Sequence, residues 1–544
     1  MKNFPKQAYK ALQSIVGAEY VSDDPVVCET YTWGGEFVDT LYQRGTTSPG
    51  CVVLPRTTSE VQKIIKLCNR YGIPFKPIGS FWGQHCAAKI PEFLKPGTPS
   101  FLSIDLKRMN TLEFDEKNMY AIVEPGVIYS PMQEQAMRRG LYTLTPGGGS
   151  QACVIGNHIN HSFSPLCYRV GLPSRRILGG EWVLADGEIL RFGSLASQDD
   201  PFWGEGPGVD LRGLLRGTVG WWGKTGIVTK LAVKLHPLFK PERLKPIGIS
   251  PATTLEFPTN RIRWYNITMP NLEALFTAMR EIGKAEIGAA IMRVPMLWRY
   301  RAKAKTREHF WELWEADEEE IRKNPVYILR ILLIGYTSEK QLQYEERVLQ
   351  DIIAELGGEF RRTRPTDESW IKNADSAGMW WPAGGYVSVE FIHDTLGHSI
   401  ARGETLSREK ETFIPPLVDE YGEKGWYQMV ELGHTSYFEF LIQWDPYQPT
   451  GDYVSGEYKA YEFWIDNQRV GVDEHQYISH LGPMTVLGIT GAAYGPNYYP
   501  LMEKVRRMLD PNEVSDPPFD MHDRVIAKWA PEWKKKYRLE EYRF

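Results

Sequence analysis

Glycine-rich turns beside hydroxyl side chains are the residues in this sequence most suited to binding chemistry. The first such segment, Gly79-Ser80-Phe81-Trp82-Gly83, follows a strand-like stretch, and a second, Pro146-Gly147-Gly148-Gly149-Ser150, leads into Gly156-Asn157. A diphosphate needs several converging backbone N–H donors, and glycine permits that approach because it has no side chain. We therefore predict that these segments bind a phosphate-containing cofactor, with the hydroxyl groups of Ser80 and Ser150 as further donors.

Tight turns alone are the alternative explanation for these glycines, since glycine-rich turns are common. We favour cofactor contact for the triple glycine at 147–149 and a turn for Gly187 and Gly213. No G-x-G-x-x-G motif follows the first strand, which makes a Rossmann dinucleotide site the weaker alternative.

The histidines and cysteines do not form a metal-binding pattern. His158 and His161 have H-x-x-H spacing, but two ligands without an acidic or thiol partner are insufficient. We expect both to form hydrogen bonds, and we predict no metal. None of the six cysteines is in a C-x-x-C pair, which argues against iron–sulfur and c-type haem sites and favours free thiols.

Composition restricts the class of protein. The 544 residues are too many for one hydrophobic core, so we expect two joined domains. The 63 basic and 68 acidic side chains give no basic excess, which argues against nucleic-acid binding. No apolar run is long enough for a membrane span, and the first residues do not resemble a signal peptide, so we expect a cytoplasmic protein.

The elements that would position the glycine segments alternate between strand and helix. We predict a helix with apolar positions Val61, Ile64, Ile65 and Cys68, capped by Thr58 and Ser59, and another from Pro131 to Gly140. Further helices are predicted at 321–333, 341–356 and 499–509, and strands at 51–55, 73–78, 101–105, 121–125, 387–392 and 437–444. We assign residues 1–240 to a first domain, 241–481 to a second, and 482–544 to a segment that returns to the first.

Six motifs in fixed order carry a family resemblance. They are Pro77–Gly83, Glu124–Tyr129, Thr145–Asn157, Leu184–Leu190, Asp210–Thr218 and Gly223–Thr229. Over roughly residues 50–237 and the C-terminal segment, the series resembles the FAD-binding domain of the vanillyl-alcohol-oxidase and p-cresol-methylhydroxylase family. The resemblance implies an α+β fold, with a two-part FAD-binding domain beneath an α+β cap. It also implies FAD as cofactor and adds Gly226, Ile227 and Val228 to the cofactor-binding residues.

Some members of the family bind their flavin covalently. The histidine used by some relatives corresponds to Phe81, and the cysteine of doubly linked relatives falls near Ser150, so neither linkage is expected here. Other relatives use a residue on a cap strand, and the resemblance places Tyr437 at that position.

Phenol-oxidising relatives bind the substrate oxygen with two tyrosines and an arginine. Tyr129 and Tyr477 match the two tyrosines, but Ile478 replaces the arginine. Candidate replacement cations are His434, His393, Arg175 and Arg176, of which His434 is our catalytic candidate. The alternative is a structural role for each histidine and a solvated loop for Arg175-Arg176. The stretch 166–176 has no Asp to match the carboxylate that some relatives place near the flavin.

The leading function is an FAD-dependent oxidoreductase that removes a hydride from a para-substituted phenol or aromatic alcohol. One alternative keeps the fold but takes a 2-hydroxy acid or an ether-lipid-synthase-like substrate, and another is a flavin electron-transfer subunit of a larger complex. The sequence leaves open whether oxygen or an electron-transfer protein accepts the electrons, and whether the chain forms a homo-oligomer.

Overall fold

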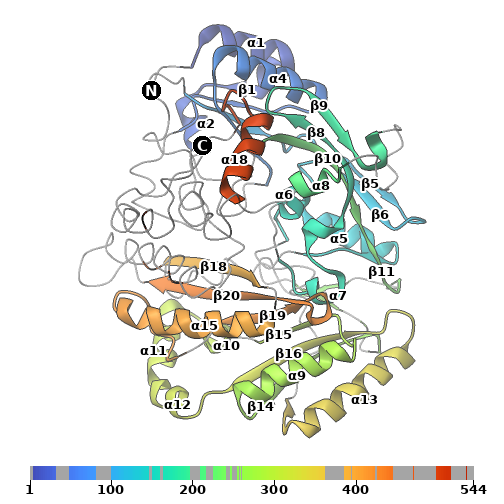
Figure 1. Cartoon of the computed structure of the whole chain (residues 1–544), viewed down its shortest axis with the longest axis vertical. Coiled ribbons are helices and arrows are strands. Elements are labelled where there is room, and N and C mark those ends of the chain that lie inside the picture. Colours follow the sequence, from blue (N-terminus) through green and yellow to red (C-terminus); the bar gives the residue numbers. More distant parts are fainter. Residues whose placement is uncertain are drawn as a thin grey trace.

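The structure is a computed structural model. It describes residues 4–31, 48–80, 100–145, 150–159, 163–196, 209–215, 225–240, 245–247, 254–256, 258, 260–293, 295–361, 385–393, 395–422, 425–444, 463, 470, 498–515 and 535. We call residues 4–240 together with 498–515 the N-terminal part, and residues 245–444 the middle part. Figure 1 shows the two parts stacked along the long axis. The proposed domain boundaries at 240 and 481 stay predictions.

The first sheet of the N-terminal part holds the strand that leads into the first glycine turn. Its order is β1 (Val21–Ser22), β2 (Cys51–Val53), β4 (Leu102–Asp105) and β3 (Phe75–Ile78), and the last three strands are parallel. Helices α1 (Lys6–Val16) and α4 (Thr58–Tyr71) pack beside it, and the predicted apolar positions of α4 are buried. The N-cap of α4 is Thr57, whose hydroxyl accepts from the Glu60 N–H, so the predicted capping by Thr58 and Ser59 was wrong by one residue.

The second sheet of the N-terminal part is antiparallel. Its order is β5 (Leu112–Asp115), β6 (Tyr120–Val123), β10 (Gly226–Lys234), β8 (Ile177–Leu184) and β9 (Ile189–Phe192). Helices α5 (Tyr129–Arg138), α6 (Val154–Ile159) and α7 (Cys167–Val170) and the 3-10 turn η4 (Pro173–Arg176) come between its strands in sequence. The remaining short elements of this part are α2 (Pro25–Glu29), α8 (Arg212–Leu215) and the pair β7 (Leu141–Tyr142) with β11 (His236–Pro237).

The middle part is built on one seven-stranded antiparallel sheet. Its order is β17 (Glu359–Arg361), β14 (Ile262–Met269), β16 (Tyr327–Ile334), β15 (Ala290–Arg293), β19 (Trp426–Val430), β20 (Thr435–Trp444) and β18 (Gly385–His393). Helices α9 (Leu272–Lys284), α13 (Glu339–Glu355) and α15 (Leu396–Lys410) lie on the side away from the N-terminal part (Figure 1). The other elements are α10 (Met296–Lys303), α11 (Arg307–Ala316), α12 (Glu318–Lys323) and the ribbon β12 (Lys245–Ile247) with β13 (Thr254–Glu256).

Strand β16 shows that both faces of this sheet are covered. Leu329, Ile331 and Leu333 belong to the core under the helices. Leu332 and Ile334 point the other way, because strand side chains alternate, and they join a core shared with the N-terminal part. The second face therefore packs against the elements that carry the glycine segments.

The predicted helix at 321–333 is wrong for most of its length. Helix α12 ends at Lys323, and the chain then enters strand β16 at Tyr327. Pro325 lies between the two elements and interrupts any helix. The run 327–334 is apolar on both faces and is a central strand, a pattern that cannot be told from a buried helix by periodicity alone.

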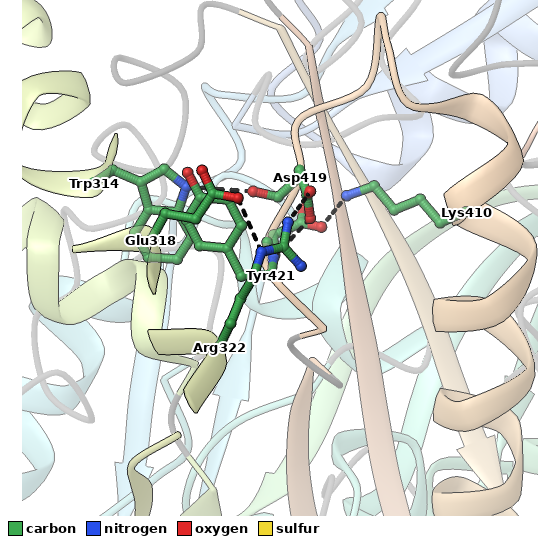
Figure 2. A network of polar contacts seen from close by, with 7 residues as sticks. Trp314, Glu318, Arg322, Lys410, Asp419 and Tyr421 are labelled. Atoms are coloured by element: carbon green, nitrogen blue, oxygen red, sulfur yellow. Dashed lines mark hydrogen bonds and ion pairs between the residues drawn. The ribbon is translucent and has the colours of Figure 1, made fainter. Parts of the chain in front are cut away.

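A polar network joins the helices at one end of the middle part to the segment before β19 (Figure 2). Arg322 of α12 pairs with Glu318 and with Asp419, and the ring of Tyr421 stacks on Trp314 of α11 with 4.9 Å between centroids. A buried ion pair between Lys410 of α15 and Glu420 completes the connection. These contacts fix the end of the sheet from which β19 begins.

The C-terminal segment returns to the N-terminal part. Helix α18 (Tyr498–Leu509) lies beside the first sheet in Figure 1, and the residues after it pair with β3. The Phe75 N–H donates to Val514 O at 2.8 Å, and the Gly226 N–H donates to Ser515 Oγ at 2.9 Å. Ser515 thus connects the start of β10 with β3. No helix in the described ranges combines the length and apolarity that crossing a membrane requires.

Candidate cofactor and substrate site

Tyr129 is the first residue of α5 and is fully buried. Two neighbours from α6 contact its hydroxyl oxygen. Asn157 Nδ2 donates to Tyr129 Oη at 2.7 Å, and His158 Nδ1 lies 3.0 Å from the same oxygen. Tyr129 belongs to the hydrophobic core that the N-terminal part shares with the middle sheet.

The hydrogen positions in this group follow from the partners of His158. Its Nδ1 lies 2.8 Å from Val154 O, and a carbonyl only accepts, so we assign the ring hydrogen to Nδ1. Nε2 is then an acceptor, buried and without a partner in the part of the chain that the structure describes. Burial lowers the pKa of His158 to about 3, so the ring is neutral. Because Tyr129 Oη accepts from Asn157 and lies beside an N–H of His158, its own hydrogen is left to donate to a ligand.

Arg176 ends the turn η4, which packs against α6. It is 1% exposed, and its Nη2 donates to Lys234 O at 2.6 Å. Burial lowers the pKa of Arg176 to about 10, so the side chain stays a cation at neutral pH. The neighbouring Arg175 is exposed and pairs with Glu431. The solvated-loop interpretation therefore fits Arg175 and is wrong for Arg176.

Three aromatic rings form a wall in the same shared core. Phe163 stacks on Tyr437 of β20 with 3.9 Å between centroids and 1° between planes, and Trp426 of β19 meets Phe163 edge-on at 5.1 Å. Tyr437 Oη donates to Glu439 Oε2 at 3.0 Å. The wall thus has one ring from the N-terminal part and two from the middle sheet. The role of Tyr437 toward the flavin stays a prediction.

Cys153 holds two of the predicted glycine segments together. A Cβ added at Gly79 would lie 2.6 Å from Cys153 Sγ, and one added at Gly156 would lie 2.8 Å from it. The Cys153 N–H donates to Ser80 Oγ at 3.0 Å. Glycine is required at both positions because the sulfur approaches both backbones. Sequence reasoning did not include Cys153 in the site, although its place between two glycine segments was a signal.

Two serines differ in how their hydroxyls are used. Ser150 is fully buried, and its Oγ has no hydrogen-bond partner among the described residues. Ser80 Oγ accepts from the Cys153 N–H, and the Ser80 hydroxyl also forms a hydrogen bond with the Cys153 thiol. A buried hydroxyl without a partner costs stability unless a ligand satisfies it, so Ser150 fits a site that binds a phosphate or another acceptor.

Strand β10 begins with three residues predicted to contact the cofactor. Gly226 has φ +114°, and an added Cβ would lie 2.2 Å from Val183 O, so only glycine fits there. Its N–H donates to Ser515 Oγ. Ile227 and Val228 are buried and pair with β8. Their contact with the cofactor stays a prediction.

Of the remaining predicted residues, His393 is the last residue of β18, and the others are exposed or outside the described ranges. His434 lies exposed in the turn between β19 and β20. The structure does not describe the following predicted residues: Phe81, Trp82, Gly83, Pro146, Gly147, Gly148, Gly149, His161, Tyr477 and Ile478. In the part of the chain that is described, no group of three or more His, Cys, Asp or Glu residues could hold a metal ion, and Cys28, Cys51, Cys68, Cys153 and Cys167 are free.

Comparison with known proteins identifies the class to which this arrangement belongs. Residues 49–193 match the family model described as an FAD binding domain. The chain shares its fold with the solved structure of 4-ethylphenol oxidase from Gulosibacter chungangensis in complex with isoeugenol. The TM-score is 0.69 at 21% identity, over 94% of this chain and 96% of that one. These findings show an FAD-binding domain within a chain that has the fold of that oxidase.

Two curated relatives match part of the chain. The glycolate oxidase subunit GlcD of Bacillus subtilis is 34% identical over 37% of this chain and 39% of its own length. The 4-cresol dehydrogenase flavoprotein subunit of Pseudomonas putida is 27% identical over 45% of this chain and 46% of its own. Each match covers less than half of the relative. The chain carries an FAD-binding domain, and the predicted family resemblance, α+β fold and FAD cofactor are confirmed.

Proposed function

We propose that this protein is an FAD-dependent oxidoreductase that removes a hydride from a small aromatic substrate, either a para-substituted phenol or an aromatic alcohol. The observation that carries this proposal is Tyr129. Tyr129 lies in the core that the FAD-binding domain shares with the middle sheet, and its buried hydroxyl accepts from Asn157, which leaves its own hydrogen to donate. Bound FAD would supply the two-electron acceptor for the hydride.

The residues of the chain then have distinct tasks. Tyr129 donates to the ring oxygen of the substrate, and Asn157 and His158 fix the direction of that hydroxyl. Hydride leaves the benzylic carbon more readily when electron density flows in from the ring oxygen, and a positioned donor stabilises the charge on that oxygen. Tyr477 is proposed as a second donor, His434 as a further catalytic group, and the oxidised product as a quinone-methide-like species that takes up water.

The proposed cofactor site uses the glycine segments and the aromatic wall. Ser80 and Ser150 would donate to phosphate oxygens, and the close packing of Gly79 and Gly156 on Cys153 holds their backbones in place. Phe163, Trp426 and Tyr437 would pack near the ring system. The electron acceptor is proposed to be oxygen or an electron-transfer protein.

A 2-hydroxy acid is the second candidate substrate. The similarity to a glycolate oxidase subunit supports it. Such a substrate is oxidised at the carbon that carries its hydroxyl, and its carboxylate needs a cation in the pocket. The two substrate classes therefore differ in whether electron density comes from an aromatic ring.

The test is anaerobic reduction of the holoprotein. We expect 4-ethylphenol or vanillyl alcohol, but not glycolate or D-lactate, to bleach the visible flavin absorbance. Tyr129→Phe should lower kcat/KM roughly 10- to 100-fold, about 1–3 kcal/mol, without loss of FAD, because the substrate oxygen loses a buried donor. Tyr168→Phe is the matched control, since the Tyr168 hydroxyl bonds to Ile282 O and Ile287 O. Bleaching by 2-hydroxy acids alone would overturn the aromatic proposal.

A further inference from the structure

A cavity of about 290 Å³ lies beside the polar network at the end of the middle part. Arg322 of α12, Lys410 of α15 and Asp419 line it, and all three are labelled in Figure 2. Glu411 and Glu420, from the segment that follows α15, add two more carboxyl groups to the lining. The volume is close to the lower end of the range of about 300–1,000 Å³ that is typical of small-molecule sites, so the cavity suits a small ligand.

Strand β20 separates this cavity from the proposed substrate region. Phe440 lines the cavity and belongs to the core under the helices, whereas Tyr437 of the same strand belongs to the core shared with the N-terminal part. Because side chains alternate along a strand, the two residues lie on opposite faces of the sheet. The cavity is therefore distinct from the site around Tyr129, and the proposed oxidation does not use it.

Glu420 is a buried carboxylate with one unused oxygen. Its side chain is 10% exposed, and Oε2 pairs with the ammonium group of Lys410. Oε1 is buried and has no hydrogen-bond partner among the described residues. Glu181 and Glu345 are also buried, but both oxygens of each accept hydrogen bonds. A buried acceptor without a partner costs stability, so Glu420 Oε1 is suited to a ligand that brings a donor.

The two cations that line the cavity are already paired with acids. Lys410 pairs with Glu420 and its Nζ lies 5.6 Å from the centre of the Phe440 ring, while Arg322 is shared between Glu318 and Asp419. Both oxygens of Asp419 accept hydrogen bonds, one of them from Arg322. The lining holds two basic and three acidic side chains. A ligand that balances this charge is a cation.

We propose that this cavity binds a small primary ammonium ion, one N–H of which donates to Glu420 Oε1. Charge-assisted hydrogen bonds between an ammonium and a carboxylate are among the strong ones in proteins. The exposed Glu411 adds a second negative charge, and Ile414 and Phe440 offer apolar surface to a short carbon chain. A metal ion does not fit, because the described residues contain no group of three or more His, Cys, Asp or Glu that could hold one.

The experiment is titration calorimetry on the FAD-loaded protein with four probes. The expected ligand is n-butylammonium, which like lysine is protonated at neutral pH. Tetramethylammonium keeps the charge without N–H groups, 1-butanol keeps the chain without the charge, and 4-aminobutyrate adds a carboxylate. We expect n-butylammonium to bind at least tenfold more tightly than each of the other three, because it alone combines a net positive charge with N–H donors.

Amide hydrogen exchange locates the bound ammonium ion. Saturating n-butylammonium should slow exchange within residues 407–422, which include most of the lining, and leave α5 and α6 unchanged. Slower exchange in α5 and α6 alone would place the ligand in the proposed substrate region instead and overturn the proposal.

Variants assign the binding to the unused carboxylate oxygen. Glu420→Gln should weaken binding of n-butylammonium at least tenfold, because the ligand loses its charged acceptor. Glu345→Gln is the matched control, since Glu345 is a buried carboxylate whose oxygens are both used, and it should bind as wild type. Glu411→Gln removes an exposed charge, so it should leave the fold intact and weaken binding roughly two- to fivefold.

The remaining outcomes each overturn the proposal. They are no binding of n-butylammonium, equal or tighter binding of any of the other three probes, unchanged affinity in Glu420→Gln, and an equal loss in Glu345→Gln. If Glu420→Gln does not fold, unchanged affinity in Glu411→Gln overturns it instead. None of these measurements needs turnover, so their result is independent of the proposed function.

Discussion

At the scale of single residues, two arginines that are adjacent in the sequence have opposite environments. Arg175 is exposed and Arg176 is buried, because the turn η4 directs one side chain to Glu431 and the other toward Lys234 O. Sequence reasoning identified both arginines as candidate cations but could not tell which of the two is buried. The glycine segments and Tyr129 were predictable from motifs because their spacing is local. The contacts of Tyr129 with Asn157 and His158 depend on how α5 packs against α6, which no local pattern records.

The approach of Cys153 to Gly79 leads to a prediction with an internal control. Gly79→Ala would place a Cβ 2.6 Å from Cys153 Sγ, so the turn that ends at Ser80 must shift. We expect reduced FAD content and a loss of about 1–3 kcal/mol of stability. Flavin-to-protein absorbance and urea unfolding measure the two effects. Cys153→Ala in the same chain should restore part of both, because it removes the sulfur, and absence of any rescue would contradict this packing argument.

The hydroxyl of Tyr437 gives a prediction about flavin attachment. It is a buried phenol that donates to Glu439 while its ring stacks on Phe163. Tyr437→Phe keeps the ring and removes the oxygen, so we expect the variant to bind FAD. If wild-type protein retains flavin after acid precipitation, the Tyr437→Phe variant should release it under the same conditions. Flavin that stays in the precipitate of Tyr437→Phe would show that the attachment is elsewhere.

At the scale of elements, the predictions of helices and strands were most accurate where the hydrophobic periodicity agrees with the residues that begin or end an element. The helix at 341–356 is α13, the strand at 437–444 lies within β20, and the helix at 499–509 is α18. The segment 321–333 failed because its apolar run is covered on both sides. The pairing of strands distant in sequence, such as β15 with β19, was also not predictable, because it depends on the order of the whole sheet.

The turn after α18 is an element that depends on one buried carboxylate. Asp510 is 1% exposed, and its two oxygens accept from the N–H groups of Val514 at 3.1 Å and Ser515 at 3.0 Å. Asp510→Ala should destabilise the protein by about 1–3 kcal/mol, because both donors lose their acceptor. Limited proteolysis should also cut the C-terminal segment faster.

Asp510→Asn provides the graded comparison, since its amide keeps a single acceptor oxygen. We expect it to fall between wild type and Asp510→Ala in urea denaturation. Equal stability of all three proteins would show that this turn does not hold the C-terminal segment against β3.

At the scale of the whole molecule, one core joins the FAD-binding domain to the middle sheet. It contains Tyr129 and Leu231 from the first and Trp264, Leu332 and Trp426 from the second. Because this core is continuous, we expect the two parts to unfold together in a single transition. The substrate region proposed around Tyr129 belongs to this shared core, so we expect changes in the middle sheet to affect it without any change in the FAD-binding residues.

Two neutral histidines in this interior make stability depend on pH. Burial lowers the pKa of His158 to about 3 and that of His236 to about 2, against about 6.5 in an unfolded chain. Between pH 6.5 and 3 the unfolded state therefore binds one more proton at each site. The free energy of unfolding should fall by roughly 1.4 kcal/mol per pH unit for each histidine as the pH is lowered through this window.

Urea unfolding of the holoprotein between pH 7.5 and 5 measures this slope. His236→Gln should lower this slope by the contribution of about one proton, because one histidine no longer binds a proton on unfolding. Substitution of the exposed His398 by Gln serves as the control. An identical slope in wild type and His236→Gln would contradict a neutral His236 in the folded protein.

The bond between Phe75 and Val514 has a consequence for how the chain is made. The edge of β3 that leads into Gly79 receives its last partner from Val514 and Ser515, which lie about 440 positions later in the sequence. At about 5–20 residues per second, a ribosome needs roughly 20–90 seconds to cover that distance. During this time β3 presents an open edge, so the nascent chain is exposed to wrong pairing and to chaperones. We therefore expect flavin loading to follow translation of the C-terminal segment.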